Sequence, residues 1–155
     1  MSIQKIIRQF EPEQHNLLNI LHALQNSSSG NYLSKEAMEE TARYLGLTKA
    51  SVYGVATYYT MFSLKPRGRF IIRICVSPVC ELMKVDIIIK QIESILDIKV
   101  GETSSDRLFT LELSECLGQC QKAPSMMVND RVYKCLGKDS IKEIIEKYRQ
   151  KAKLN

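Results

Sequence analysis

The sequence lacks any apolar run close to the roughly 20 residues that a membrane-spanning helix needs. Charged residues interrupt its longest apolar stretches, such as the one from Val85 to Ile89. The first residues also lack the apolar core and the small-residue cleavage site of a signal peptide. We therefore expect no direct membrane insertion and a cytoplasmic location, which is a reducing compartment where structural disulfides are rare.

Internal repeats, low-complexity segments and a glycine-rich phosphate loop are absent too. Hydrophobic residues make up 45% of the chain and charged residues 25%, which is the profile of a soluble globular protein. The 155 residues are enough for one ordinary domain or two small ones. The net charge of +5 is spread along the sequence and does not by itself select a partner.

The first part of the chain has the periodicity of helices. Apolar residues recur at positions i, i+3, i+4 and i+7 from Ile3 and again from Leu17. Ser34 and Thr48 are suitable caps for two further helices, and Gly46 is a suitable end for the first of these. We expect an N-terminal helical bundle over residues 1–66 as a docking domain, whose first amphipathic stripe packs on its own domain or on a partner subunit.

After the segment Lys65-Pro66-Arg67-Gly68 the apolar period changes from that of helices to that of strands. Strands are predicted at 70–74, 109–113, 125–128 and 132–135, with a tight turn about residues 129–131. Helices are predicted at 82–96 and from 139 or 140 onward. The predicted fold class is α+β: the helical bundle is followed by a thioredoxin-like α/β domain, residues 67–155, built from a βαβ unit and a ββα unit.

Five cysteines remain to be explained, an odd number that suits a disulfide framework poorly. Cys75 and Cys80 enclose four residues, and Cys116 and Cys120 enclose three. Each pair follows a predicted strand of the βαβ unit. Because parallel strands direct their carboxyl ends to one edge of a sheet, the two pairs are expected to meet there as one four-thiolate site.

The spacing of the cysteines leaves three possibilities open. Four thiolates select zinc or an iron–sulfur cluster, and unligated thiols are the third option. The loops are wider than the C-x2-C knuckles of structural zinc, which favours a [2Fe–2S] cluster with two thiolates on each iron. A thioredoxin-like redox dithiol is disfavoured because no C-x-x-C is present. Backbone N–H groups of both cysteine loops are expected to point at sulfur, and Gly118 permits close approach.

At these residues the sequence resembles the small thioredoxin-like [2Fe–2S] subunit of NADH dehydrogenase (respiratory complex I). The same subunit type occurs in NAD-dependent or electron-bifurcating hydrogenases and in formate dehydrogenases. The resemblance runs from about Leu17 to Ile145. The most specific matching segments are Tyr53-Gly54-Val55-Ala56-Thr57-Tyr58-Tyr59, Cys75-x4-Cys80, Gly101-Glu102-Thr103, Cys116-Leu117-Gly118-Gln119-Cys120 and Ala123-Pro124.

The resemblance implies a function. All four ligands of the family's cluster are retained, namely Cys75, Cys80, Cys116 and Cys120. The chain is then a non-catalytic electron-transfer subunit of an NADH-linked oxidoreductase. It exchanges single electrons with a flavoprotein subunit that binds FMN and NADH, beside further iron–sulfur or hydrogenase subunits.

Three departures from the family pattern leave the ligands alone. The first ligand loop carries Ser77-Pro78 where members often have Gly-Thr, and Lys84 and Arg107 stand where glycines are usual. These changes bear on hydrogen bonding to the cluster. They favour a soluble electron-bifurcating or NAD-dependent hydrogenase as the parent complex, with NADH:quinone oxidoreductase as the other choice.

A helix-turn-helix DNA-binding regulator with a four-cysteine zinc site is the alternative. Two predicted helices flank the turn at Gly46, but the second offers only Lys49 as a basic residue, so no nucleic acid partner is expected.

The remaining candidate residues are expected to be structural. Cys135 is predicted to be a buried strand residue, and His15 and His22 are predicted to lie at a surface or interface. Pro124 is placed where thioredoxin-like folds have a cis proline, and cis and trans are equally expected here.

Overall fold

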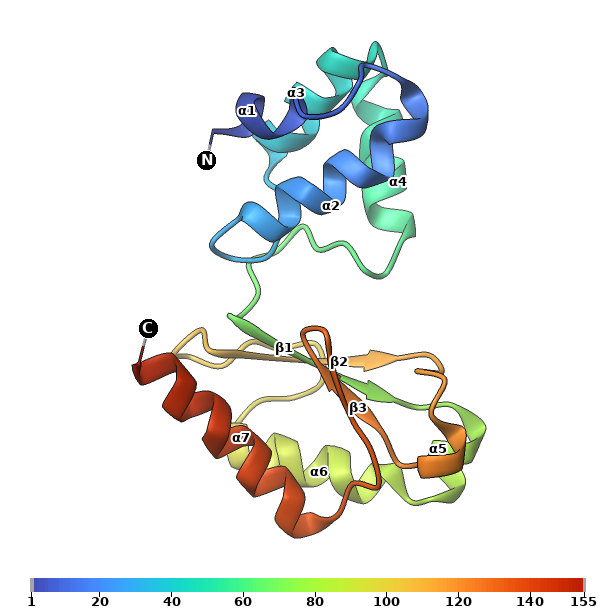
Figure 1. Ribbon diagram of the computed structural model, residues 1–155, viewed down its shortest axis with the longest axis vertical. Coiled ribbons are helices and arrows are strands. Elements are labelled where there is room, and N and C mark those ends of the chain that lie inside the picture. Colours follow the sequence, from blue (N-terminus) through green and yellow to red (C-terminus); the bar gives the residue numbers. More distant parts are fainter. Residues whose placement is uncertain (1, 155) are drawn as a thin grey trace. The chain divides into compact units, whose positions relative to one another are not determined.

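The structure is a computed structural model that describes residues 2–154. Its backbone divides into two compact units, residues 1–67 (the helical unit) and 68–155 (the sheet unit), which are described separately. The helical unit contains α1 (Ile3–Ile7), η1 (Gln14–Asn16), α2 (Leu17–Ser27), α3 (Lys35–Leu45) and α4 (Lys49–Tyr58). The sheet unit contains β1 (Phe70–Cys75), α5 (Pro78–Leu82), α6 (Val85–Leu96), β2 (Phe109–Ser114), η2 (Cys120–Lys122), β3 (Met126–Val128), β4 (Arg131–Tyr133) and α7 (Lys138–Lys153) (Figure 1).

The helices of the helical unit begin and end where the sequence predicts. The Ser34 side chain accepts a hydrogen bond from the Ala37 N–H, and Thr48 does the same for Ser51, so both predicted caps are confirmed. Gly46 ends α3 with φ of 64°. These helices enclose an apolar core whose most buried members include Ile20, Leu21, Leu33 and Val52.

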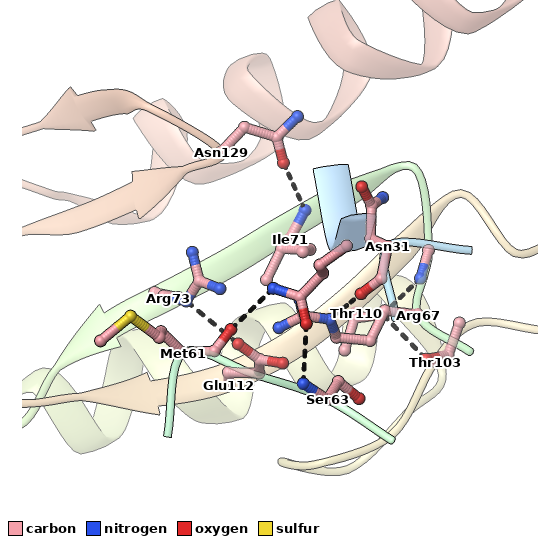
Figure 2. A network of polar contacts seen from close by, with 12 residues as sticks. Asn31, Met61, Ser63, Arg67, Ile71, Arg73, Thr103, Thr110, Glu112 and Asn129 are labelled. Atoms are coloured by element: carbon pink, nitrogen blue, oxygen red, sulfur yellow. Dashed lines mark hydrogen bonds and ion pairs between the residues drawn. The ribbon is translucent and has the colours of Figure 1, made fainter. Parts of the chain in front are cut away.

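A buried amide fixes the segment that follows α4. Gln25 is 4% exposed; its Nε2 donates to the Met61 carbonyl at 2.9 Å and its Oε1 accepts the Ser63 N–H at 2.8 Å (Figure 2). Both ends of the amide are therefore satisfied, as a buried polar side chain requires.

Among the helices within residues 2–154, none has the length and apolar character that crossing a bilayer requires.

The sheet unit is a four-stranded mixed sheet in the order β2-β1-β3-β4. β1 and β2 are parallel, whereas β1 with β3 and β3 with β4 are antiparallel. Helices α6 and α7 cover one face of the sheet (Figure 1). Their apolar side chains form one core with the inward residues of the strands, including Ile72, Ile74, Phe109 and Leu111. The predicted βαβ and ββα units and the α+β class are confirmed.

Polar side chains reinforce the strand register. Arg73 and Glu112 are register partners across β1 and β2, and their side chains form an ion pair at 3.1 Å (Figure 2). Asn129 lies in the predicted turn between β3 and β4 with φ of 50°, and its Oδ1 accepts the Ile71 N–H at 2.8 Å. The turn is therefore tied to the neighbouring strand β1 as well as to its own hairpin.

Two predictions about individual residues are wrong. The single helix expected at 82–96 is broken, because Lys84 has a φ of 61° and separates α5 from α6, which leaves Leu82 79% exposed. Cys135 lies beyond β4 and is exposed. The chain there has already left the sheet: Cys135 has a φ of 50°, and Leu136 takes the buried position. Alternation of apolar residues does not reveal such a left-handed residue.

Lys84 and Arg107, which depart from the family's glycines, both keep a left-handed backbone, with φ of 61° and 55°. A Cβ in this region destabilises the folded state by roughly 1–2 kcal/mol. Glycine would remove this strain, but its greater flexibility in the unfolded chain would offset about 0.5–1 kcal/mol of the gain. Lys84→Gly is therefore expected to raise the free energy of unfolding by up to about 1 kcal/mol. Lys90→Gly, at an exposed position inside α6, is the matched control and should lower it by about 1 kcal/mol. Denaturant unfolding followed by circular dichroism measures both, and equal losses would contradict the argument.

Candidate metal centre

The four predicted site cysteines come together at one edge of the sheet. Cys75 is the last residue of β1 and Cys80 lies in α5, while Cys116 follows β2 and Cys120 begins η2. In the parallel pairing of β1 with β2, Cys75 lies opposite Ser114. Figure 1 accordingly shows α5 and the segment after β2 at the same end of the sheet. The expected juxtaposition of the two pairs is therefore observed.

The second pair is tight. The sulfur atoms of Cys116 and Cys120 are 3.4 Å apart, and the Gly118 N–H donates to Cys116 Sγ at 3.4 Å. Gly118 has a φ of 71°, which a residue with a side chain rarely adopts. The hydrogen bond and charge of Cys116 raise the pKa of Cys120, with a smaller contribution from the charges of Cys75 and Cys80. The two pairs are thus close enough to interact electrostatically.

Cys75 is surrounded by hydrogen-bond donors. Burial raises the pKa of its thiol, but hydrogen bonds from the Ser77 hydroxyl, the Ser77 N–H and the Leu117 N–H outweigh burial and lower the pKa to about 7. Ser77 Oγ lies 3.2 Å from Cys75 Sγ. Backbone donors from both cysteine loops therefore reach sulfur, as predicted. They favour the thiolate, which is the form that binds metals.

The site has a buried side and an open side. Cys75 and Cys80 are each 1% exposed, whereas Cys116 and Cys120 are exposed. Three apolar side chains beside Cys80 are also exposed and are called the α5 patch: Val79, Leu82 and Met83. An exposed cluster of large apolar side chains is typical of a protein contact.

The arrangement of the donors is compatible with a [2Fe–2S] cluster. The thiols form two pairs, Cys75 with Cys80 and Cys116 with Cys120. These pairs would hold such a cluster with two thiolates on each iron.

Sequence reasoning missed two hydroxyl groups near the thiols. Ser77 lies next to Cys75, and the buried Ser125 places its Oγ 4.0 Å from Cys80 Sγ. A hydroxyl two residues after a cysteine is a signal that was available for Ser77. Ser125 precedes β3 and reaches Cys80 only through the pairing of β3 with β1, so no local pattern indicates it.

Other candidate residues lie outside the four-thiol site. The Cys135 N–H donates to the Lys122 carbonyl at 2.8 Å, which places its backbone beside η2. The Ala123-Pro124 peptide bond is cis, which decides between the two forms expected equally. In the helical unit His15 is exposed, and the ring of His22 packs on Phe62 with centroids 4.8 Å apart.

The helix-turn-helix alternative finds little support in the helical unit. Lys49, the basic residue at the start of α4, is paired with Glu39 at 2.8 Å. The exposed large side chains of α4 are Tyr53 and Tyr58, at 53% and 79% exposure. Such a helix presents aromatic surface, whereas phosphate binding needs free cations.

Comparison with known proteins agrees with the geometry. Residues 3–149 match the model of the thioredoxin-like [2Fe-2S] ferredoxin family. The chain is 36% identical over 146 residues to the E subunit of NADH-quinone oxidoreductase from Aquifex aeolicus, covering 94% of this chain and 90% of that protein. It is 37% identical over 147 residues to the corresponding protein of Rickettsia prowazekii, covering 94% of this chain and 82% of that protein.

Solved structures agree in fold. The crystal structure of an air-oxidized NAD+-reducing [NiFe]-hydrogenase superposes with a TM-score of 0.78 at 22% identity. The superposition covers 88% of this chain but only 23% of the hydrogenase chain. The family description names the cofactor of this chain as a [2Fe-2S] cluster. The chain belongs to the thioredoxin-like [2Fe-2S] ferredoxin family, as a homologue of the E subunit of NADH-quinone oxidoreductase.

Proposed function

We propose that the chain is a non-catalytic electron-transfer subunit whose cluster is held by Cys75, Cys80, Cys116 and Cys120. The observation that carries the proposal is the meeting of the two thiol pairs at the carboxyl edge of β1 and β2. Bound there, a [2Fe–2S] cluster supplies reversible one-electron redox chemistry. The chain's own residues hold it, direct N–H and O–H groups at its thiolates and leave one side open.

The electron partner in this proposal is a flavoprotein subunit that binds FMN and NADH. One electron leaves the reduced flavin as one electron is taken up at the site, and no bond in this chain forms or breaks. The chain has no glycine-rich phosphate loop, so the nicotinamide is assigned to the partner. Further iron–sulfur or hydrogenase subunits complete the complex.

The two parts of the chain have separate roles in this proposal. Residues 67–155 carry the cluster, and residues 1–66 form a helical docking domain, for which the exposed Tyr53, Tyr58 and Met61 are suitable contacts. The subunit is assigned to the cytoplasm, where cysteine thiols are kept reduced. The parent complex is a hydrogenase, including an electron-bifurcating one, or an NADH:quinone oxidoreductase. Copurification of the native complex and identification of its other subunits distinguish these.

The α5 patch lies next to the site and is our candidate for the flavoprotein contact. Burial of a leucine side chain is worth roughly 1.5–3 kcal/mol, and about 1.4 kcal/mol changes affinity tenfold. Leu82→Glu is therefore expected to slow NADH-dependent reduction of the cluster at least about tenfold in the reconstituted complex. Stopped-flow absorbance at subsaturating partner concentration measures this rate.

Leu154→Glu is the matched control, because Leu154 is 84% exposed and follows the distal end of α7 (Figure 1). It should leave the rate unchanged. Equal rates for wild type and Leu82→Glu would remove the α5 patch from the interface. Failure of NADH to reduce the wild-type cluster in the presence of the flavoprotein would overturn the proposed function itself.

A further inference from the structure

The Ser77 hydroxyl lies within hydrogen-bond distance of one of the two buried thiols. Its Oγ is 3.2 Å from Cys75 Sγ, and the two residues are 9% and 1% exposed. Water therefore has little access to this hydrogen bond. A hydrogen bond to a charged group in such surroundings is stronger than one at the surface.

The hydroxyl is not needed to begin the neighbouring helix. Ser77 is the N-cap residue of α5, yet its side chain makes no capping hydrogen bond there. The backbone carbonyl of Ser77 accepts the Glu81 N–H at 3.0 Å, and this contact does not involve the hydroxyl. Removing the hydroxyl should therefore leave α5 and the position of Cys80 in place.

The direction of the hydrogen bond follows from the chemistry of a metal ligand. A ligating cysteine is a thiolate and has no proton to give, so the Ser77 hydroxyl must donate to Cys75 Sγ. The Ser77 N–H and the Leu117 N–H approach the same sulfur. Three donors on one thiolate stabilise negative charge, and the reduced form of the site carries one more negative charge than the oxidised form. Donation therefore favours reduction.

We propose that Ser77 is a positioning residue. Its hydroxyl raises the reduction potential of the cluster by donating a hydrogen bond to Cys75 Sγ. The inference rests on the proposed ligand role of Cys75. Ser125 is the natural comparison, because its Oγ is also buried but lies 4.0 Å from Cys80 Sγ, too far for a strong hydrogen bond.

The test is a redox titration of the full-length chain, monitored by electron paramagnetic resonance. Ser77→Ala and Ser77→Gly both remove the hydroxyl and keep the backbone N–H. At a fixed ambient potential each is expected to lower the ratio of reduced to oxidised cluster about tenfold, which is about 59 mV for a one-electron couple. Ser77→Thr keeps a hydroxyl and should restore most of the ratio. Ser125→Ala should change it less than threefold.

A second readout reports the hydrogen bond itself. Hyperfine spectroscopy of the reduced protein in H2O and in D2O detects exchangeable protons near the cluster, and the Ser77→Ala spectrum should lack one coupling present in wild type and in Ser77→Thr. An unchanged midpoint in both Ser77→Ala and Ser77→Gly, with full cluster content, overturns this inference and leaves the proposed function standing. Failure of both variants to assemble the cluster also overturns it, since the hydroxyl would then be structural. A cluster that persists in Cys75→Ala overturns the proposed ligand set instead.

Discussion

Cys116→Ala is expected to abolish the electron paramagnetic resonance signal of the [2Fe–2S] cluster. The Cys116 and Cys120 sulfur atoms are 3.4 Å apart and form one of the two thiol pairs. With the proposed ligand set, removal of Cys116 would break the second pair and leave one iron with a single thiolate. Because Cys116 is exposed, the substitution deletes little packing, so loss of the signal reports ligation.

Cys135→Ala is the matched control. Cys135 is also exposed, and its N–H donates to the carbonyl of Lys122, two residues after Cys120. Of the five cysteines it is the one outside the two pairs. Its removal should leave both the signal and the iron content intact.

Metal analysis and the visible spectrum complete this experiment. The wild-type protein should be brown and contain two irons per chain, while Cys116→Ala should be colourless with a preserved far-ultraviolet circular dichroism spectrum. A colourless wild type with one zinc would refute the cluster assignment. If Cys135→Ala lost the signal and Cys116→Ala kept it, the ligand set would be wrong.

Gly68→Ala is expected to destabilise the sheet unit by about 2–3 kcal/mol. A Cβ at Gly68 would lie 2.7 Å from the carbonyl carbon of Phe109 and 2.8 Å from its nitrogen. These are backbone atoms of β2, which cannot rotate away as a side chain can. Relief requires β1 and β2 to separate at the Phe70–Phe109 end of their parallel register. Denaturant unfolding should show a lower midpoint.

Gly54→Ala is the control for this prediction. Gly54 lies within α4 and has open space where a Cβ would be placed. Alanine is favoured over glycine inside a helix by about 1 kcal/mol, so this variant should be slightly more stable than wild type. Equal stability of Gly68→Ala and wild type would show that the two strands can separate at no cost.

Local patterns were enough for most of the elements. Helix caps such as Ser34 and Thr48 act within one turn, so their effect is written in neighbouring residues. The same is true of the turn at Asn129 and of the change in apolar period after Gly68. The edge at which the cysteines meet also followed from the order of elements, because parallel strands leave little choice.

Residues with a left-handed backbone conformation are where the prediction of helices and strands from the sequence fails. Lys84 and Cys135 have positive φ, and neither is a residue type that signals it. Leu82, before the break at Lys84, and Cys135 itself are exposed, against expectation. Such conformations are imposed by packing of the flanking elements, which sequence periodicity does not contain.

The sequence by itself determined the four thiols, their pairing along the chain and the strands that carry them, since these depend on residue type and local period. Only the tertiary structure decided which of the four cysteines are buried and which are exposed to solvent. It showed that the Ser77 hydroxyl reaches Cys75 Sγ, a contact that the short spacing in the sequence allows, and it alone revealed the Ser125 hydroxyl near Cys80. The reason is physical: burial and hydrogen bonding near a thiolate depend on distances between segments up to 45 residues apart, as for Cys80 and Ser125, and only the folded chain sets those distances.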